Sequence, residues 1–215
     1  MNHRAPKSNE TFAAYSHATA LIFAIIGSIY LIVLARENIG LLITTIVYSL
    51  CLCFMFGASA IYHTVKREDF EVSVWRKVDH VAIYFMIAGS YTAISYIYTD
   101  GNFRWIIIGL QWGFVVVGTI LKILYIKVPI WIDVGIYLVM GWMIVIRLDY
   151  MFKAFPLRIF LLVLFGGIAY TVGAIFHALN KQKPFPGVFV FHDIFHVLII
   201  VGASVHYTTI LEAVL

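Results

Sequence analysis

The sequence predicts an all-α membrane protein, a bundle of seven transmembrane helices. Hydrophobic residues make up 62% of the 215 residues and charged residues only 12%, whereas roughly a quarter of an ordinary soluble domain is charged. Apolar runs of about 20 residues, the length that crosses a bilayer as a helix, fill nearly the whole chain. Helices are expected in these runs because a helix satisfies its own backbone hydrogen bonds in lipid.

Seven such runs follow one another with short links between them. They cover residues 13–35, 39–63, 78–98, 103–125, 130–147, 157–179 and 190–213, and the fifth is the shortest. The first run is longer than the apolar core of a secretory signal peptide and six more follow it, so we interpret it as a retained helix. The short links predict a single transmembrane domain over residues 1–215, with residues 1–12 as a short cytosolic tail.

The positions of Lys and Arg predict how the bundle is oriented. Ten lie in the first tail and around the links after the second, fourth and sixth runs: Arg4, Lys7, Lys66, Arg67, Arg76, Lys77, Lys122, Lys127, Lys181 and Lys183. Five lie toward the other side: Arg36, Arg104, Arg147, Lys153 and Arg158. The positive-inside rule then places the N-terminus in the cytosol and the C-terminus outside. We interpret the basic links as topology signals that contact lipid headgroups, and we expect no nucleic-acid partner.

Three histidines are expected at one depth near the cytosolic face. His192 and His196 lie four residues apart, on one face of the seventh helix, and His63 ends the second helix. Ionisable side chains are costly in lipid, so they indicate a functional site. Three imidazoles fill three positions of a tetrahedral zinc site and leave the fourth open to water, which is the pattern of a catalytic zinc.

Two further polar residues are expected at the same depth. Asp79 begins the third helix, and Ser59 lies one turn before His63 on the second. Zinc lowers the pKa of a water that it holds to about 7. We expect Asp79 to hold or deprotonate this water, and Ser59 to form a hydrogen bond with the water or with the substrate.

The other polar residues are interpreted as structural. His17, His177 and His206 are predicted to form hydrogen bonds between helices. His80 points about 100° away from Asp79 on its helix, so it is expected to support the site or face the membrane interface rather than bind metal. Asp133 is expected to face the headgroups, and Arg147 and Asp149 are expected to pair at the outer end.

These motifs also carry a resemblance. Ser59-Ala-Ile-Tyr-His63, Asp79 and His192-Asp-Ile-Phe-His196 occur in this order on three predicted helices. They resemble the progestin and adiponectin receptor superfamily, and within it the small bacterial hemolysin III proteins in size and topology. The resemblance implies a zinc ion held by His63, His192 and His196, with Ser59 and Asp79 beside it. It also implies kinship with alkaline ceramidases, which hydrolyse lipid amides, and with bacterial members tied to cytolysis and membrane homeostasis.

Three classes of function stay open at this point. The first is a zinc-dependent hydrolase of a lipid amide or ester, in the bacterial cytoplasmic membrane, with membrane lipids as its partners. The second is a sensor or regulator of the bilayer in which the metal is structural. The third is a conduit, either a proton path or a cytolytic pore; against a proton path, the polar groups gather on one side and only His206 continues across. The sequence predicts no particular oligomeric state.

Overall fold

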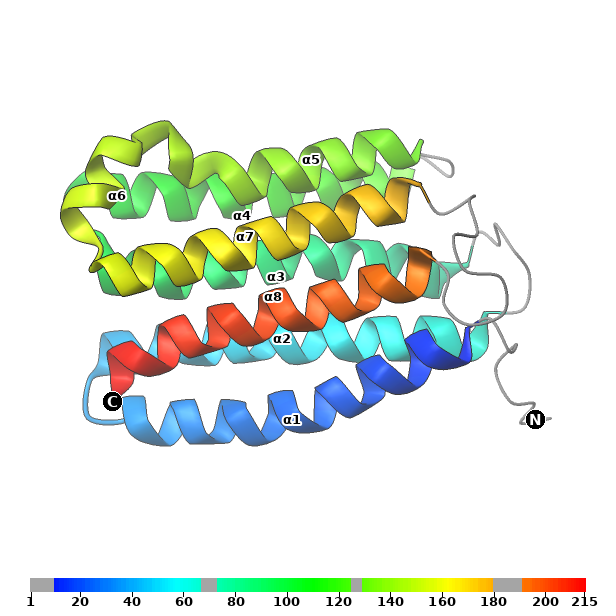
Figure 1. Ribbon diagram of the computed structural model, residues 1–215, viewed down its shortest axis with the longest axis horizontal. Helices are drawn as coiled ribbons and strands as arrows, with labels where there is room; N and C mark the ends of the chain where they lie inside the picture. Colours follow the sequence, from blue (N-terminus) through cyan, green and yellow to red (C-terminus); the bar gives the residue numbers. More distant parts are fainter. Residues whose placement is uncertain (1–9, 67–72, 125–128, 180–190) are drawn as a thin grey trace.

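The computed structural model describes residues 10–66, 73–124, 129–179 and 191–215, and every element in them is helical. Seven helices in these residues are long and apolar enough to cross a membrane, which confirms the predicted fold class. Figure 1 shows them along the long axis of the bundle. Six spans are continuous helices: α1 (Thr11–Ala35), α2 (Ile39–Val65), α3 (Val74–Tyr98), α4 (Gly101–Leu124), α7 (Leu157–Ala178) and α8 (Phe191–Val214).

The fifth span differs from its prediction as one short helix over 130–147. It continues to Ala154 as three segments: α5 (Ile130–Trp142), the 3₁₀ helix η1 (Met143–Arg147) and α6 (Leu148–Ala154). The hydroxyl of Tyr91 in α3 donates to the carbonyl of Gly141 at 2.7 Å and accepts from the amide of Ile144 at 3.1 Å. A side chain from another helix therefore satisfies backbone groups at the break, which is how a broken helix is tolerated in lipid.

Two helix starts depend on capping side chains. Asn38 accepts hydrogen bonds from the amides of Gly40 and Leu41 at the start of α2. Ser73 accepts from the amide of Arg76 at 3.2 Å, so α3 begins at Val74, four residues before the predicted start of its apolar run. Asn and Ser are preferred at this position because their side-chain oxygens bind amides that have no partner within the helix. The predicted tail 1–12 is also shorter than expected, since α1 already begins at Thr11.

The bundle brings the first and last helices together. Helix α1 contacts both α2 and α8. The start of α1, the end of α2 and the start of α8 consequently meet at one end of the bundle, which we call the N-terminal end; the C-terminus lies at the opposite end (Figure 1). The starts of α3 and α5 and the ends of α4 and α7 lie at the N-terminal end as well.

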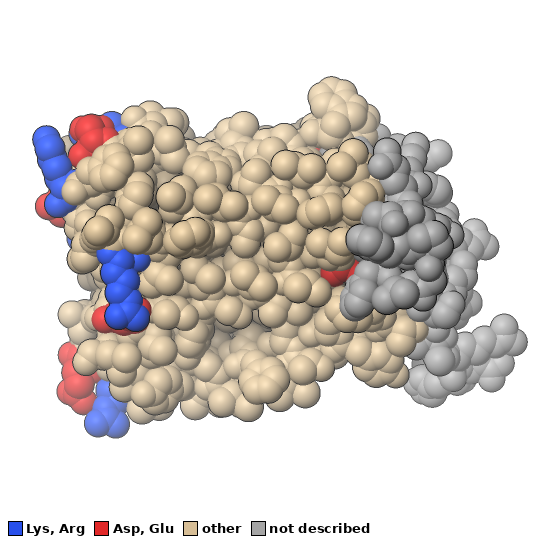
Figure 2. Space-filling view, in the orientation of Figure 1, with Lys and Arg blue, Asp and Glu red and all other residues tan. Residues whose placement is uncertain are grey.

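The outer surface of the bundle is apolar. Large side chains such as Phe23 and Trp131 are about 70% exposed, and Figure 2 shows a wide band on the visible face without Lys, Arg, Asp or Glu. Charged side chains gather at the end that holds the C-terminus. The predicted pair is found there, with Arg147 Nε 3.0 Å from Asp149 Oδ1. An apolar band between polar ends fits a protein that is integral to the membrane.

Candidate metal centre

Three histidines converge at the N-terminal end, as the sequence predicted. His63 comes from the last turn of α2, and His192 and His196 come from the first turns of α8. One nitrogen from each of the three rings lies within 4.8 Å of the other two, so the group can hold a metal ion. His63 and His196 are only 2% and 1% exposed. The convergence follows from the packing of α2 and α8 side by side at this end.

The spacing of the two ring nitrogens from α8 fits zinc. The Nε2 atoms of His192 and His196 are 3.3 Å apart. Two ligands held at about 2.0–2.1 Å in a tetrahedral arrangement stand roughly 3.3 Å apart. Imidazole nitrogens without a thiolate are a donor set that suits zinc among the common metals. The residues present therefore fit the ion that the resemblance implies.

Glu10 holds the other side of the His63 ring. Its Oε2 atom is 2.6 Å from His63 Nδ1, and its Oε1 atom is 2.5 Å from the ammonium of Lys66. Burial raises the pKa of the Glu10 carboxyl, but the hydrogen bonds and positive charges of His63 and Lys66 outweigh it and lower the pKa to about 2. An ionised carboxylate only accepts, so Nδ1 of His63 donates to it, which leaves Nε2 as the His63 nitrogen that can face a metal.

His17 plays the corresponding part for His196. Its Nε2 atom is 2.9 Å from Nδ1 of His196, and the two rings meet edge to face with centroids 4.2 Å apart. His17 lies on α1, so the prediction that it forms a hydrogen bond between helices is confirmed. When Nε2 of His196 faces a metal, its Nδ1 carries the proton and donates to His17.

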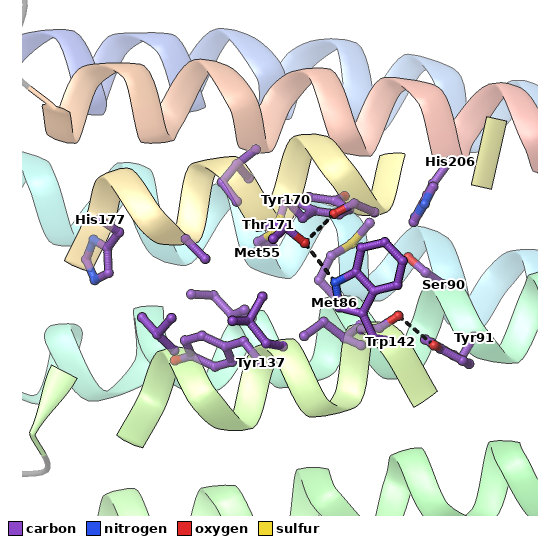
Figure 3. Close-up of a pocket in the computed structure, with 18 of the residues that line it drawn as sticks. Met55, Met86, Ser90, Tyr91, Tyr137, Trp142, Tyr170, Thr171, His177 and His206 are labelled. Carbon is purple, nitrogen blue, oxygen red and sulfur yellow. Dashed lines mark hydrogen bonds between the residues drawn. The ribbon is translucent and has the colours of Figure 1, made fainter. Parts of the chain in front are cut away.

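A largely apolar cavity is lined in part by His17, which also bonds His196 of the three-histidine group. Its volume is about 130 Å³, and its walls come from α1, α2, α3, α5, η1, α7 and α8. Figure 3 shows His177 at one end and His206 at the other, with Met55, Met86 and Trp142 between them. The cavity is elongated and mostly apolar, with a histidine toward each end and a few polar side chains, such as Thr171, between them.

Ser59 and Asp79 both line this cavity, together with His17. Ser59 is buried on α2, one turn before His63, and Asp79 lies near the start of α3. The structure thus brings the two residues predicted to act on water or substrate to one cavity. His17 connects this cavity to the three-histidine group, because it lines the cavity and also bonds His196.

A second polar cluster lies between α3, α4 and α5. The ammonium of Lys122 donates to the carboxylate of Asp133, and Nδ1 of His80 lies 3.3 Å from Asp133 Oδ2. Asp133 is 2% exposed, so the prediction that it faces the headgroups is wrong. Lys122 is also buried instead of lying in a basic link. A Lys and an Asp on facing helices neutralise each other, which permits burial that neither charge sustains alone.

His206 and His177, the two histidines not yet described, differ in their contacts. Nε2 of His206 lies 3.5 Å from the carbonyl of Val163 on α7, a long contact between helices of the predicted kind. The Nδ1 atom of His177 has no hydrogen-bond partner in the described part of the chain, so a hydrogen bond between helices stays a prediction for this residue. Its ring instead packs at 4.6 Å from the ring of Phe195.

Sequence reasoning missed Glu10, which fell in the predicted tail, and gave His17 no link to the metal ligands. One signal was available. Glu10 and His17 are seven residues apart, two helical turns, which places them on the same face at the start of the first span. That face is the one that contacts α2 and α8.

Comparison with known proteins shows the family to which the chain belongs. The family described as "Haemolysin-III related" matches residues 6–207. Hemolysin-3 of Bacillus cereus is 29% identical over 204 residues, covering 94% of this chain and 90% of that protein. The Hemolysin-3 homolog of Bacillus subtilis is 26% identical, covering 92% and 91%. The human Monocyte to macrophage differentiation factor is 29% identical over 226 residues, covering 98% and 90%. The chain therefore belongs to the hemolysin III family of multi-pass membrane proteins.

Proposed function

We propose that this protein is a zinc-dependent hydrolase that cleaves an amide or ester of a membrane lipid. The observation that carries the proposal is the apolar cavity lined by Ser59, Asp79 and His17, because His17 also bonds His196 of the histidine group. Ligand pockets are mostly apolar, with a few polar groups that fix the orientation of the ligand. A lipid chain lies along the cavity, and its carbonyl group lies at the N-terminal end. We place the protein in the bacterial cytoplasmic membrane, with this end toward the cytosol.

His63, His192 and His196 hold the metal in this proposal. When bound there, zinc supplies a Lewis acid and lowers the pKa of a water molecule to about 7. Glu10 and His17 orient two of the imidazoles through the bonds described above. The apolar walls exclude bulk water, which strengthens every polar interaction at the reacting carbonyl.

The proton steps are assigned to Asp79. It takes a proton from the attacking water while the water oxygen bonds to the carbonyl carbon. It then returns the proton to the leaving nitrogen or oxygen as the bond from that atom to the carbonyl carbon breaks. Ser59 donates its hydroxyl hydrogen to the carbonyl oxygen as negative charge develops there. The products are a free carboxylic acid and an amine or an alcohol.

The test is the release of fatty acid from defined vesicles. Purified full-length protein is reconstituted into liposomes that contain an N-acyl lipid and an ester lipid, and free fatty acid is measured by mass spectrometry. Zinc-dependent release is expected from the wild type, and Asp79→Asn lowers it by about 10² or more. Asp149→Asn, at the opposite end of the bundle, serves as the control. Equal release from wild type and Asp79→Asn contradicts the assignment of the proton steps.

A second function is favoured by one observation. The histidine group joins α2 to α8, so a metal there also acts as a structural link between distant parts of the chain. A regulator of bilayer state needs that link and no turnover. Stoichiometric zinc with no fatty acid release from any vesicle supports this function over the hydrolase. Leakage of a trapped dye from the same vesicles tests a cytolytic role, the activity that the names of the Bacillus relatives describe.

A further inference from the structure

We propose that the first turns of α1 are part of the metal centre, because Glu10 and His17 fix the tautomers of two ligands and set the affinity for the metal. The inference rests on the metal site proposed above. It adds two residues from a third helix to a group that otherwise comes from α2 and α8 alone. Neither residue touches the metal; each acts through the ring that it holds.

Glu10 contributes both orientation and charge. Its carboxylate is 4% exposed and is used at both oxygens, by His63 on one side and by Lys66 on the other. Three neutral imidazoles bring no negative charge to a divalent ion. A carboxylate one hydrogen bond away makes the bound imidazole a stronger donor and partly compensates the charge in an apolar setting.

His17 contributes an acceptor. It is 2% exposed, and Phe56 packs edge-on against its ring with centroids 5.2 Å apart. This packing fixes the ring so that Nε2 points at Nδ1 of His196. An acceptor at this point selects the tautomer of His196 that leaves Nε2 free, and Nε2 is the atom 3.3 Å from His192.

Both contacts depend on the same helix. Glu10 reaches α2 and His17 reaches α8, so α1 must be seated against both helices for the two ligands to be held. Partners of this kind typically change metal affinity by 10–100-fold when they are removed. The affinity of the site for metal therefore depends on how well the start of α1 packs against α2 and α8.

The experiment measures zinc affinity by competition with a chromogenic chelator on purified full-length protein in detergent. Glu10→Gln keeps the shape but removes the charge, and His17→Leu removes the acceptor; each is expected to weaken binding by about 10–100-fold. His17→Gln retains an oxygen that can accept from His196, so it is expected to bind within a few-fold of the wild type. Glu37→Gln, an exposed carboxylate paired with Arg36 at the other end, is the matched control.

A second measurement separates an effect on metal binding from an effect on the stability of the metal-free protein. The rise in Tm on adding zinc, relative to the same variant without metal, depends on affinity, because a ligand stabilises only the state that binds it. Smaller rises for Glu10→Gln and His17→Leu, with metal-free Tm values near the wild type, support the inference. Wild-type affinity and wild-type Tm rises in both variants overturn it and leave the metal site intact. Absence of zinc binding by the wild type overturns the metal site itself.

Discussion

The Nε2 atoms of His192 and His196 lie 3.3 Å apart at the start of α8. At this separation two neutral imidazoles either share one proton or direct two lone pairs at a common cation. The third ring, His63, has its proton committed to Glu10 and therefore turns a lone pair toward the same place. The three rings can therefore hold a metal ion.

The first prediction concerns metal content. His196→Ala removes a ligand whose nitrogens face both His192 and His17, so the purified variant is expected to lose stoichiometric zinc. His206→Ala, on the same helix but at the far end of the cavity, is expected to keep it. Elemental analysis of both proteins after exchange into metal-free buffer is the measurement. Stoichiometric zinc in His196→Ala contradicts the ligand assignment.

The second prediction concerns metal removal. A zinc ion in the proposed site would join α2 and α8, so a strong chelator is expected to lower the Tm of the wild type. With free zinc near 1,000 times its Kd, the metal adds about 4.1 kcal/mol to the free energy of unfolding. The chelator is expected to leave the Tm of His192→Ala unchanged, which serves as the control. An equal fall in both proteins means that the chelator acts elsewhere.

The third prediction concerns the buried ion pair between α4 and α5. Asp133→Leu leaves the ammonium of Lys122 buried without its counter-charge, and is expected to lower the free energy of unfolding by about 3–5 kcal/mol. The double variant Lys122→Met with Asp133→Leu is expected to regain most of this loss, because no charge is left behind. Thermal unfolding followed by thiol labelling of Cys51, which is buried, measures both.

A matched control for this pair lies at the other end of the bundle. Asp149→Asn breaks an ion pair with Arg147 that is exposed on both sides, so no measurable change in Tm is expected. If Asp133→Leu and Asp149→Asn lower Tm by similar amounts, the burial of the unpaired Lys122 charge carries no additional cost.

The fourth prediction concerns the cavity. A side chain added at Gly141, which lines the cavity, meets no atom within 4 Å of its Cβ, so Gly141→Leu fills the space without forcing the helices apart. Burial of one methylene group contributes about 0.8 kcal/mol to binding. If the new side chain keeps two methylene groups of an acyl chain out of the cavity, the affinity for that chain is expected to fall roughly tenfold. Displacement of a fluorescent fatty acid measures this.

Gly109→Leu is the control for the cavity variant. Gly109 also has open space at its Cβ but does not line the cavity, so affinity for the fluorescent fatty acid is expected to stay at the wild-type value. Equal affinity in Gly141→Leu and Gly109→Leu indicates that the chain does not bind in this cavity.

The fifth prediction concerns orientation. The excess of Lys and Arg in the first tail and around the links after the second, fourth and sixth spans predicts that the N-terminal end lies in the cytosol. A phosphatase fused after Leu215 is expected to be active, because this reporter works only outside the cytosol, and green fluorescent protein fused there is expected to be dark. Fusions after Leu124, at the end of α4, are expected to show the opposite pattern. Fluorescence from the fusion after Leu215 reverses the assignment.

Much of the fold was accessible from composition and run length, since a bilayer demands helices of a given length whatever their sequence. The fifth span shows where this reasoning stops. Its break at Trp142 is sustained by the hydroxyl of Tyr91, a residue about 50 positions earlier in α3. Nothing in the local sequence between 130 and 154 signals that partner, so one short helix was predicted.

Lys122 and Asp133 show the same limit for charges. Each is near the end of its helix, where a charge ordinarily reaches the headgroups. Because α4 and α5 place the two side chains opposite each other, they pair within the bundle instead. Local position predicts exposure, whereas pairing across helices decides burial.

The sequence by itself determined that this protein spans the membrane as seven helices. The spacing of His192 and His196, with the helix rise, also placed both on one face and at the depth of His63. Only the tertiary structure decided that Glu10 bonds His63 and that His17 bonds His196. It also decided that Ser59 and Asp79 line one apolar cavity. The reason is physical: helix periodicity fixes which residues share a face and a depth, but the rotation and neighbours of each helix are set by packing between segments far apart in the chain.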